Sequence, residues 1–329
     1  MRLDARECTA REFLALSERR RPFARESAFT PDRQACDPAK NALLRRRHAL
    51  VGAFAGEEIA ARLLLLDGGE TAWFSLPVLG EAEAARALLC KAEEIAARWG
   101  AREICGPVSP DGSGFGLGAA LPGSAAQAQP WHPGRNDALV QALLREGFLP
   151  TTRLLEMAIP IAGRENPYRG AGEWAARRKG LRVCVLPMDR RACEAAFAAS
   201  EDAHALGYAA FERVFARCAA LERRCRAIVA FEKEQPAGWI LFAPAQAQDG
   251  RAVRLLHMQI LPRYRRGACA AALLEAAWEE AAARRAGRIF VSTIDSANRA
   301  SFSLSRNAGG EIVSEYALFG REILTKGSN

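Results

Sequence analysis

Apolar and polar positions in the first half of the chain predict three neighbouring strands, a long helix and a further short strand. The helix, expected at 80–99, repeats apolar residues on one face and ends at Gly100. Nearer the start of the chain, Thr9 and Glu12 form a capping box, which predicts a helix over 10–20. The strands are expected at 48–54, 59–67, 71–76 and 103–105.

The second half of the chain repeats this alternation and ends on a strand. Its helices carry an apolar stripe, whereas its strands are short apolar runs bounded by turn-forming or charged residues. The expected strands are 181–186, 226–231, 238–243, 255–261, 288–294 and 312–319, and the expected helices are 190–200, 209–221, 268–284 and 298–307.

Three spacings between matched residues are the same in the two halves, namely eleven, sixteen and eleven positions. Such self-similarity predicts that the chain contains one structural unit twice. We expect a helix and an irregular segment over 1–40, a first unit over 41–161, a polar, glycine-rich linker over 162–180 and a second unit over 181–325. The matched pairs are Pro77–Leu88 with Pro262–Leu273, Leu88–Ile104 with Leu273–Ile289, and Asn136–Gly147 with Asn298–Gly309.

Composition and charge narrow the class of protein. The net charge is +8, but the arginines that supply it often stand beside glutamates and form no stripes with aromatic residues, so we expect no nucleic-acid partner. Every long apolar run contains charges, and no apolar segment follows the charged first residues, which predicts a cytoplasmic protein without a membrane span. The nine cysteines include no C-x-x-C pair and no histidine at metal spacing, so we expect neither a metal nor disulfides.

The stretch from Val253 to Arg285 joins a buried strand, a basic glycine turn and a helix. Unpaired N–H groups and the positive end of the dipole at the start of a helix attract an anion, and arginines add charge-assisted hydrogen bonds. Small residues let a ligand approach the backbone. This layout predicts a phosphate site made by Arg265, Arg266, Gly267, Ala268, Cys269 and Ala270.

The same turn resembles the acyl-CoA-binding motif of the GNAT N-acyltransferase superfamily, Arg/Gln-x-x-Gly-x-Gly/Ala. Residues 261–270 read Leu-Pro-Arg-Tyr-Arg-Arg-Gly-Ala-Cys-Ala, with Arg265 first and Ala268 where the first glycine is usual. Together with the order of elements over the second half, the resemblance implies an α/β fold. It would consist of two tandem GNAT-like units, with mixed, mostly antiparallel sheets flanked by helices.

The first half departs from this motif. Opposite the arginine turn it carries Glu81 and Glu83, and because carboxylates repel a diphosphate, we expect a degenerate GNAT-like unit without a coenzyme site. It also has a glycine-rich insertion over 106–135, which we interpret as a loop because it lacks the Lys-Ser/Thr of a P-loop and opens no helix. Tandem two-half GNAT proteins carry a similar Gly-Pro…Pro-Asp-Gly-Ser-Gly-Phe segment.

The resemblance also implies a reaction. An acetyl group from acetyl-CoA, or another acyl group from its acyl-CoA, would pass to a small-molecule or peptide amine, with the acyl-CoA as co-substrate and no metal. The second unit would hold the coenzyme, its diphosphate on the turn and its thioester carbonyl near the backbone amides of Gln259, Ile260 and Leu261. Asn298 would either position the coenzyme or cap its own helix.

Proton transfer has several candidates. The tyrosine acid of the family lies seven residues after this asparagine, a position that holds Ser305 here. A serine hydroxyl is a poor acid, and because a thiol has a pKa of about 8.5, the leaving thiolate could take its proton from water. The candidate bases are His257, on the strand beside the coenzyme, and Glu201, Asp202 and His204, in the turn between two expected helices.

Two other functions stay open at this point. Ala268 and Ser305, which depart from the family pattern, are compatible with a non-catalytic acyl-CoA-binding protein. The positive charge is compatible with an aminoacyl transferase that uses aminoacyl-tRNA, although the sequence has no long helical-hairpin insertion of the kind that such enzymes carry.

Overall fold

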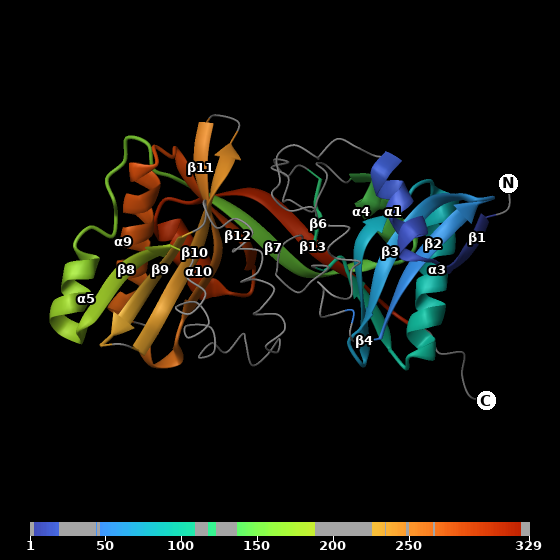
Figure 1. Ribbon diagram of the computed structural model, residues 1–329, viewed down its shortest axis with the longest axis horizontal. Coiled ribbons are helices and arrows are strands. Elements are labelled where there is room, and N and C mark those ends of the chain that lie inside the picture. The colour runs from blue at the N-terminus through green and yellow to red at the C-terminus, as the bar shows by residue number, and fades with distance from the viewer. Residues whose placement is uncertain are drawn as a thin grey trace. The chain divides into compact units, whose positions relative to one another are not determined.

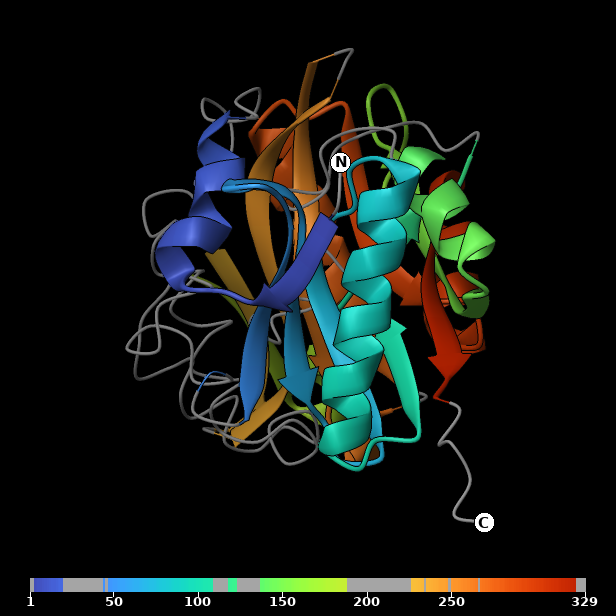
Figure 2. The same ribbon diagram turned by 90° about the vertical axis from the view of Figure 1, so that its right-hand side faces the viewer.

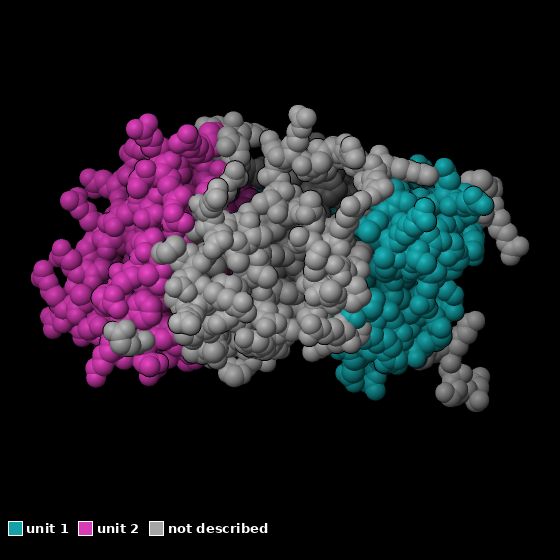
Figure 3. All heavy atoms as spheres, viewed as in Figure 1, with its two compact units in different colours: residues 1–154, 314–329 teal, residues 155–313 magenta. Residues whose placement is uncertain are grey.

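The computed structural model divides the chain into two compact units. Unit 1 comprises Met1–Leu154 and Ser314–Asn329, and unit 2 comprises Leu155–Val313 (Figure 3). No helix among the described residues is long and apolar enough to cross a membrane. The structure describes residues 3–19, 44, 47–108, 118–122, 137–187, 226–233, 235–247, 250–265 and 267–323.

Unit 1 is built on a mixed sheet with the strand order β1-β2-β3-β4-β5-β13, and β6 pairs with β13 (Figure 1). The pairs are antiparallel except β4 and β5, which are parallel and are joined through α3. The bounds are β1 Leu3–Glu7, α1 Ala10–Arg19, β2 His48–Ala55, β3 Glu58–Asp67, β4 Thr71–Val78, α3 Ala82–Arg98, β5 Glu103–Gly106, β6 Ala119–Ala120, α4 Asp137–Arg145 and β13 Glu311–Glu322.

Helices on both faces of this sheet explain the continuous apolar run in β3. Leu63 and Leu65 belong to the core that α3 covers, whereas Leu64 packs on the other face against Phe13 of α1. Figure 2 shows α3 lying across the strands of the unit. A strand that is buried on both faces needs apolar residues at successive positions, which is the pattern that the sequence has.

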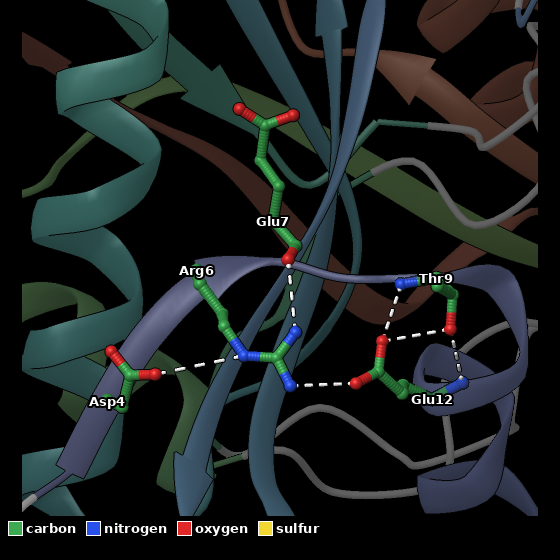
Figure 4. A network of polar contacts seen from close by, with 5 residues as sticks. All are labelled: Asp4, Arg6, Glu7, Thr9 and Glu12. Carbon is green, nitrogen blue, oxygen red and sulfur yellow. Dashed lines mark hydrogen bonds and ion pairs between the residues drawn. The ribbon is translucent and has the colours of Figure 1, made fainter.

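The capping box predicted at the start of α1 is confirmed. The Glu12 carboxylate accepts a hydrogen bond from the Thr9 backbone N–H at 2.7 Å, and the Thr9 hydroxyl accepts one from the Glu12 N–H at 3.3 Å (Figure 4). The same carboxylate pairs with Arg6 at 2.7 Å. Beneath the helix, the buried Arg62 of β3 donates to the Phe13 carbonyl at 2.7 Å, which ties α1 to the sheet.

Unit 2 has the strand order β7-β12-β11-β10-β9-β8. β11 and β12 are parallel and are joined through α9, while β8 to β11 form an antiparallel set. The bounds are β7 Leu149–Pro160, α5 Ala171–Lys179, β8 Leu181–Pro187, β9 Arg226–Glu232, β10 Gln235–Ala247, β11 Gly250–Ile260, the 3-10 helix η2 Pro262–Tyr264, α9 Ala268–Ala283, β12 Arg288–Asp295 and α10 Arg299–Asn307.

The internal repeat is visible in both units. A strand, a helix and a parallel strand follow one another as β4-α3-β5 and again as β11-α9-β12. The matched Leu88 and Leu273 are fully buried, and the matched Ile104 and Ile289 lie buried on the returning strands. The expectation of two tandem units with mixed, mostly antiparallel sheets flanked by helices is confirmed.

The segment 162–180, expected to be a linker, contains α5 and lies within unit 2. Ala175 is fully buried in the core of unit 2, and the backbone N–H groups of Gly170 and Gly172 both donate to the Glu275 carboxylate of α9. Ala175 is the single buried residue of α5. A helix with so narrow a buried face has no apolar stripe, which is why its sequence did not indicate a helix.

Three further strands, β1, β6 and β7, did not feature in the expectation from sequence, and the two-residue β6 lies in the insertion that we expected to be a loop. β1 precedes α1 and is mostly exposed, so it lacks the apolar alternation that marks a strand. β7 follows α4 and contains the boundary between the two units, at Leu154 and Leu155. The helices expected at 190–200 and 209–221, and most of the insertion at 106–135, lie outside the described residues.

Candidate active site

The turn after β11 leads directly into the first turn of α9. β11 ends at Ile260, η2 follows, and Gly267 stands at the N-cap position of α9 in an extended conformation. Gly267 has no side chain that could cap the helix, and no side-chain cap of its first turn is found among the described residues. The N–H groups of this turn are therefore available to an anionic ligand, which the helix dipole also favours.

Ala268 and Cys269 point into the core of unit 2, with 7% and 1% of their surface exposed. Because the Ala268 methyl packs in the core, replacing the usual glycine does not fill the space in front of the helix. Burial raises the pKa of the Cys269 thiol to about 12, so this thiol stays protonated at neutral pH and is a poor nucleophile.

Arg265 is exposed and turns back toward the end of β11, where its Nε donates to the Ile260 carbonyl at 3.1 Å. The neighbouring Tyr264 hydroxyl donates to the Glu232 carboxylate of β9 at 2.6 Å. Desolvation and this hydrogen bond raise the pKa of Tyr264. The turn is thus fixed to β9 through Tyr264, and it holds a guanidinium at the end of β11.

β11 and β12 pair over a short stretch and then continue beyond it. Their parallel register runs up to Leu255 and Val291, whereas β11 extends to Ile260 and β12 to Asp295. The extension of β11 leads to the turn before α9. The end of β11 therefore presents one edge toward the side of β12, next to the uncapped start of α9.

Backbone geometry singles out one amide at this edge. The Leu261 N–H donates to the Ala237 carbonyl at 3.0 Å, on the β10 side. Successive N–H groups alternate between the two edges of a strand, so the N–H of Ile260 points to the β12 side and that of Gln259 to the β10 side. Of Gln259, Ile260 and Leu261, Ile260 is the one whose N–H and carbonyl lie on the β12 side, and this carbonyl accepts the hydrogen bond from Arg265.

His257 lies on β11 beside Trp239 of β10. The buried Trp239 donates from its indole N–H to Nδ1 of His257 at 3.1 Å, and the two rings stack with centroids 6.1 Å apart. An indole N–H can only donate, so Nδ1 holds a lone pair and the proton of the neutral imidazole is on Nε2. The base role expected for His257 needs a free lone pair, whereas this arrangement makes His257 a hydrogen-bond donor.

Asn298 caps α10, because its side-chain oxygen accepts a hydrogen bond from the Ser301 N–H at 3.2 Å. This contact favours the capping alternative for Asn298. Further along α10, Ser305 is buried, and the adjacent Leu304 carbonyl accepts a hydrogen bond from the Tyr168 hydroxyl at 3.0 Å. Burial raises the pKa of Tyr168. No motif marks this tyrosine, which comes from the segment before α5.

The expected site residues thus fall into two groups. Glu201, Asp202, His204 and Arg266 lie outside the described residues. The others lie on three segments of unit 2, namely β11 and its end (His257, Gln259, Ile260, Leu261), the turn and start of α9 (Arg265, Gly267, Ala268, Cys269, Ala270), and α10 with its cap (Asn298, Ser305).

Comparison with protein families agrees with this geometry. The segment 186–309, which includes every described element from β9 to α10 and therefore β11, the turn and α9, matches the model of the Acetyltransferase (GNAT) family. A search of curated protein sequences finds no match to the chain.

Solved GNAT structures resemble the whole chain. A tandem GNAT protein from the clavulanic acid biosynthesis pathway, solved without acetyl-CoA, is 14% identical over 99% of this chain and 100% of its own, with a TM-score of 0.61. A GCN5-related glucosamine N-acetyltransferase region of a fungal multi-domain GH3 β-N-acetylglucosaminidase is 11% identical over 97% of this chain and 38% of its own, with a TM-score of 0.62. A GCN5-related N-acetyltransferase from Sphaerobacter thermophilus is 16% identical over 98% of this chain and 96% of its own, with a TM-score of 0.51. The chain therefore has a tandem GNAT fold.

In unit 1, the strands that correspond to β11 and β12 are β4 and β5, and these stay hydrogen-bonded to each other past the end of β5. The chain after β5 continues the pairing with β4, because the Val108 N–H donates to the Phe74 carbonyl at 2.8 Å and the Ser75 hydroxyl donates to the Val108 carbonyl at 2.6 Å. Glu81 occupies the N-cap position of α3, and Glu83 lies in its first turn. This GNAT-like unit therefore combines a closed strand pair with an acidic helix start, both of which disfavour a bound diphosphate.

Proposed function

We propose that the protein is an N-acyltransferase that binds acetyl-CoA in unit 2 and transfers the acetyl group to a small-molecule or peptide amine. One observation carries this proposal: the uncapped first turn of α9 directly follows the edge of β11 that extends past its pairing with β12. A diphosphate on the helix start then places a thioester within reach of a backbone amide. The match of residues 186–309 to the GNAT family model supports acyl transfer as the reaction class.

Each part of the coenzyme has a place in this arrangement. The diphosphate would bind to N–H groups at the start of α9, with Arg265 and Arg266 contributing charge-assisted hydrogen bonds. The pantetheine arm would follow the edge of β11. The thioester oxygen would accept a hydrogen bond from the Ile260 N–H, a donor fixed by the strand and therefore aimed before the reaction starts.

The transfer itself needs two proton movements. A neutral amine attacks the thioester carbon, its new C–N bond forms, and the charge on the oxygen is stabilised at Ile260. The C–S bond then breaks, the amine loses a proton to a base, and the thiolate takes one from an acid or from water. Glu201 and His204 remain the proposed bases, because Nδ1 of His257 already accepts the Trp239 bond. Ser305 is the proposed acid at the position that the resemblance indicates.

The direct test is a calorimetric titration of acetyl-CoA into the wild type and into a variant with Arg265→Ala and Arg266→Ala. Hydrogen bonds to charged groups contribute about 1.5–3 kcal/mol, so losing both arginines should weaken binding by at least about tenfold. Arg251→Ala, an exposed arginine at the opposite end of β11, is the control and should bind as the wild type does.

The outcome separates the proposed function from its alternatives. If the wild type does not bind acetyl-CoA at millimolar concentration, the acetyltransferase proposal is overturned. If it binds, and then releases free thiol with an amine from a panel of small amines and peptides, the enzyme proposal is supported. Binding without turnover on any amine would favour a non-catalytic acyl-CoA-binding protein, the function that Ser305 in place of a tyrosine makes the main competitor.

A further inference from the structure

We propose that Tyr264 is a positioning residue for coenzyme binding, and that its hydrogen bond to Glu232 holds the arginine turn in the conformation that receives the diphosphate. The arginine turn is the segment 262–267 between β11 and α9. This inference rests on the proposed function, because it takes the diphosphate to bind at this turn. Both residues lie outside the motif at 265–270, so the resemblance gives neither of them a role.

Both ends of the arginine turn are fixed against β10. At the end of β11, the Leu261 N–H donates to the Ala237 carbonyl at 3.0 Å. At the start of α9, Cys269 lies against Gly238, where an added Cβ would be 3.3 Å from the cysteine sulfur. A glycine in β10 thus lets the first turn of α9 approach the sheet closely. The packing of β11 and α9 therefore sets where the arginine turn begins and ends.

The middle of the arginine turn has no such packing. Among its described residues, Tyr264 alone is not exposed. The Tyr264 hydroxyl donates to the Glu232 carboxylate at 2.6 Å, the length of a charge-assisted hydrogen bond. The backbone of Glu232 is itself held on both sides, because it pairs with Leu181 of β8 and with Gln235 of β10. This hydrogen bond therefore attaches the middle of the turn, past β10, to a fixed point of the sheet.

A turn that is held in place before the ligand arrives binds it more tightly. Ordering a mobile loop on binding costs free energy, and a contact that orders the loop in advance removes part of this cost. The arginine turn carries Arg265 and leads into the N–H groups at the start of α9, and the proposed diphosphate site needs both at once. Tyr264 should therefore raise the affinity for coenzyme A without touching it.

The internal repeat offers a comparison within one chain. With the two halves aligned on their matched spacings, Leu79 stands opposite Tyr264, and it is buried in the core of unit 1. Ala55 ends β2 at its turn into β3, as Glu232 ends β9 at its turn into β10. Unit 1, which we expect to lack a coenzyme site, thus has neither partner of the hydrogen bond. A buried leucine would meet a purely structural need, so the polar pair in unit 2 favours a role in binding.

The first test is a calorimetric titration of acetyl-CoA into the wild type and into Tyr264→Phe. This variant removes the hydroxyl and keeps the ring, whose centroid lies 4.6 Å from the Arg263 guanidinium. Because a surface hydrogen bond is partly screened by water, its loss should weaken binding about 3- to 10-fold. Thr71→Val removes a hydroxyl–carboxylate hydrogen bond of the same kind, to Glu103 in unit 1, and as the matched control it should bind acetyl-CoA as the wild type does.

A second comparison separates the hydrogen bond from the charge of Glu232. A carboxylate beside the turn repels a diphosphate, so charge alone predicts that Glu232→Ala and Glu232→Gln bind acetyl-CoA equally, and more tightly than the wild type. Glutamine keeps an acceptor for the Tyr264 hydroxyl, whereas alanine does not. Glu232→Ala should therefore bind about 3- to 10-fold more weakly than Glu232→Gln. Adding Tyr264→Phe to Glu232→Ala should cause no further loss, because the bond is already broken.

Thermal melts of the same variants complete the test. A Tyr264→Phe variant that melts at a lower temperature but binds acetyl-CoA as the wild type does would overturn the inference in favour of a purely structural role. Equal affinities of Glu232→Ala and Glu232→Gln would overturn it as well, and both results would leave the proposed function intact. A wild type that does not bind acetyl-CoA at millimolar concentration would instead overturn the proposed function, and this inference with it.

Discussion

At the scale of single residues, His257 shows how one hydrogen bond limits the chemistry of a side chain. The indole N–H of Trp239 is a donor only, and its target is Nδ1 of His257. Trp239 is 1% exposed, so water cannot easily take the place of this bond. The imidazole is therefore held as the tautomer with its proton on Nε2, which makes it a hydrogen-bond donor in its neutral form.

This tautomer can be observed directly. In a protein labelled with ¹⁵N-histidine, we expect long-range ¹H–¹⁵N spectra near neutral pH to show an unprotonated Nδ1 and a protonated Nε2 for His257. Trp239→Phe removes the donor and should give a mixture of tautomers. The chain has four histidines, so His257→Gln identifies the signal. A wild-type spectrum with the proton on Nδ1 would contradict the assignment and restore His257 as a candidate base through Nε2.

Residues of the candidate site were predictable where their role depends on neighbours in sequence. The turn at Arg265 and the helix start at Gly267, where we propose the anion site, are local features, because a glycine turn and a helix start are defined by neighbouring residues. The same is not true of His257, whose tautomer is set by a residue 18 positions away, or of Tyr168, which reaches Leu304 across 136 positions. Such contacts depend on the folded sheet, and no spacing in the sequence encodes them.

At the scale of elements, the start of α1 shows a local signal that the fold reinforces. Thr9 and Glu12 form the capping box, and Arg6 of β1 adds an ion pair to the same carboxylate (Figure 4). The hydrogen bond from Arg6, followed by those from Thr9, lowers the pKa of Glu12 to about 2 from an ordinary value of 4.5. The capping box was predictable from sequence, whereas Arg6 could not be assigned because β1 was not expected.

This pKa shift predicts a pH dependence for the stability of unit 1. A carboxyl group with a lowered pKa binds its proton more weakly in the folded state, so its contribution is fully present above about pH 4.5 and is lost as the pH falls toward about 2. Glu12→Gln should therefore lower the thermal midpoint at pH 6, and this difference from the wild type should disappear by about pH 2. Circular dichroism melts over this pH range measure it.

The control for this prediction is Glu57→Gln, an exposed carboxylate in the turn between β2 and β3. It should leave the midpoint at pH 6 close to that of the wild type. A Glu12→Gln variant whose deficit stays constant from pH 6 to pH 2 would contradict the assignment, because the deficit would then come from the shape of the side chain and not from its charge.

At the scale of the whole molecule, unit 1 contains strands from both ends of the sequence, β1 and the later part of β13. The strand expected at 312–319 is confirmed as part of β13, but its C-terminal portion pairs with β5 and β6, whereas the sequence led us to expect it in the second unit. Apolar alternation is a local property and predicts that a strand forms. The choice of sheet depends on partners far along the chain, so the pattern cannot predict it.

Contacts of β13 in unit 1 explain why this strand matters there. Phe319 is fully buried in the core that α3 covers, and Arg321 forms an ion pair with Glu93 of α3. Losing a buried phenylalanine side chain alone costs about 3–5 kcal/mol, a large part of the roughly 5–15 kcal/mol that stabilises a typical domain. Unit 1 should therefore depend on the part of β13 from Ser314 to Glu322.

Two truncations test this dependence by hydrogen exchange. A chain that stops after Val313 lacks the part of β13 in unit 1, and its α3 amides should lose most of their protection, whereas α9 in unit 2 should stay protected and serve as the internal reference. A chain that stops after Ile323 keeps the whole strand, so its α3 should exchange as in the full chain. If α3 stayed equally protected in both truncations, β13 would be dispensable to unit 1, and residues 1–154 would have to fold without the strand that completes their sheet.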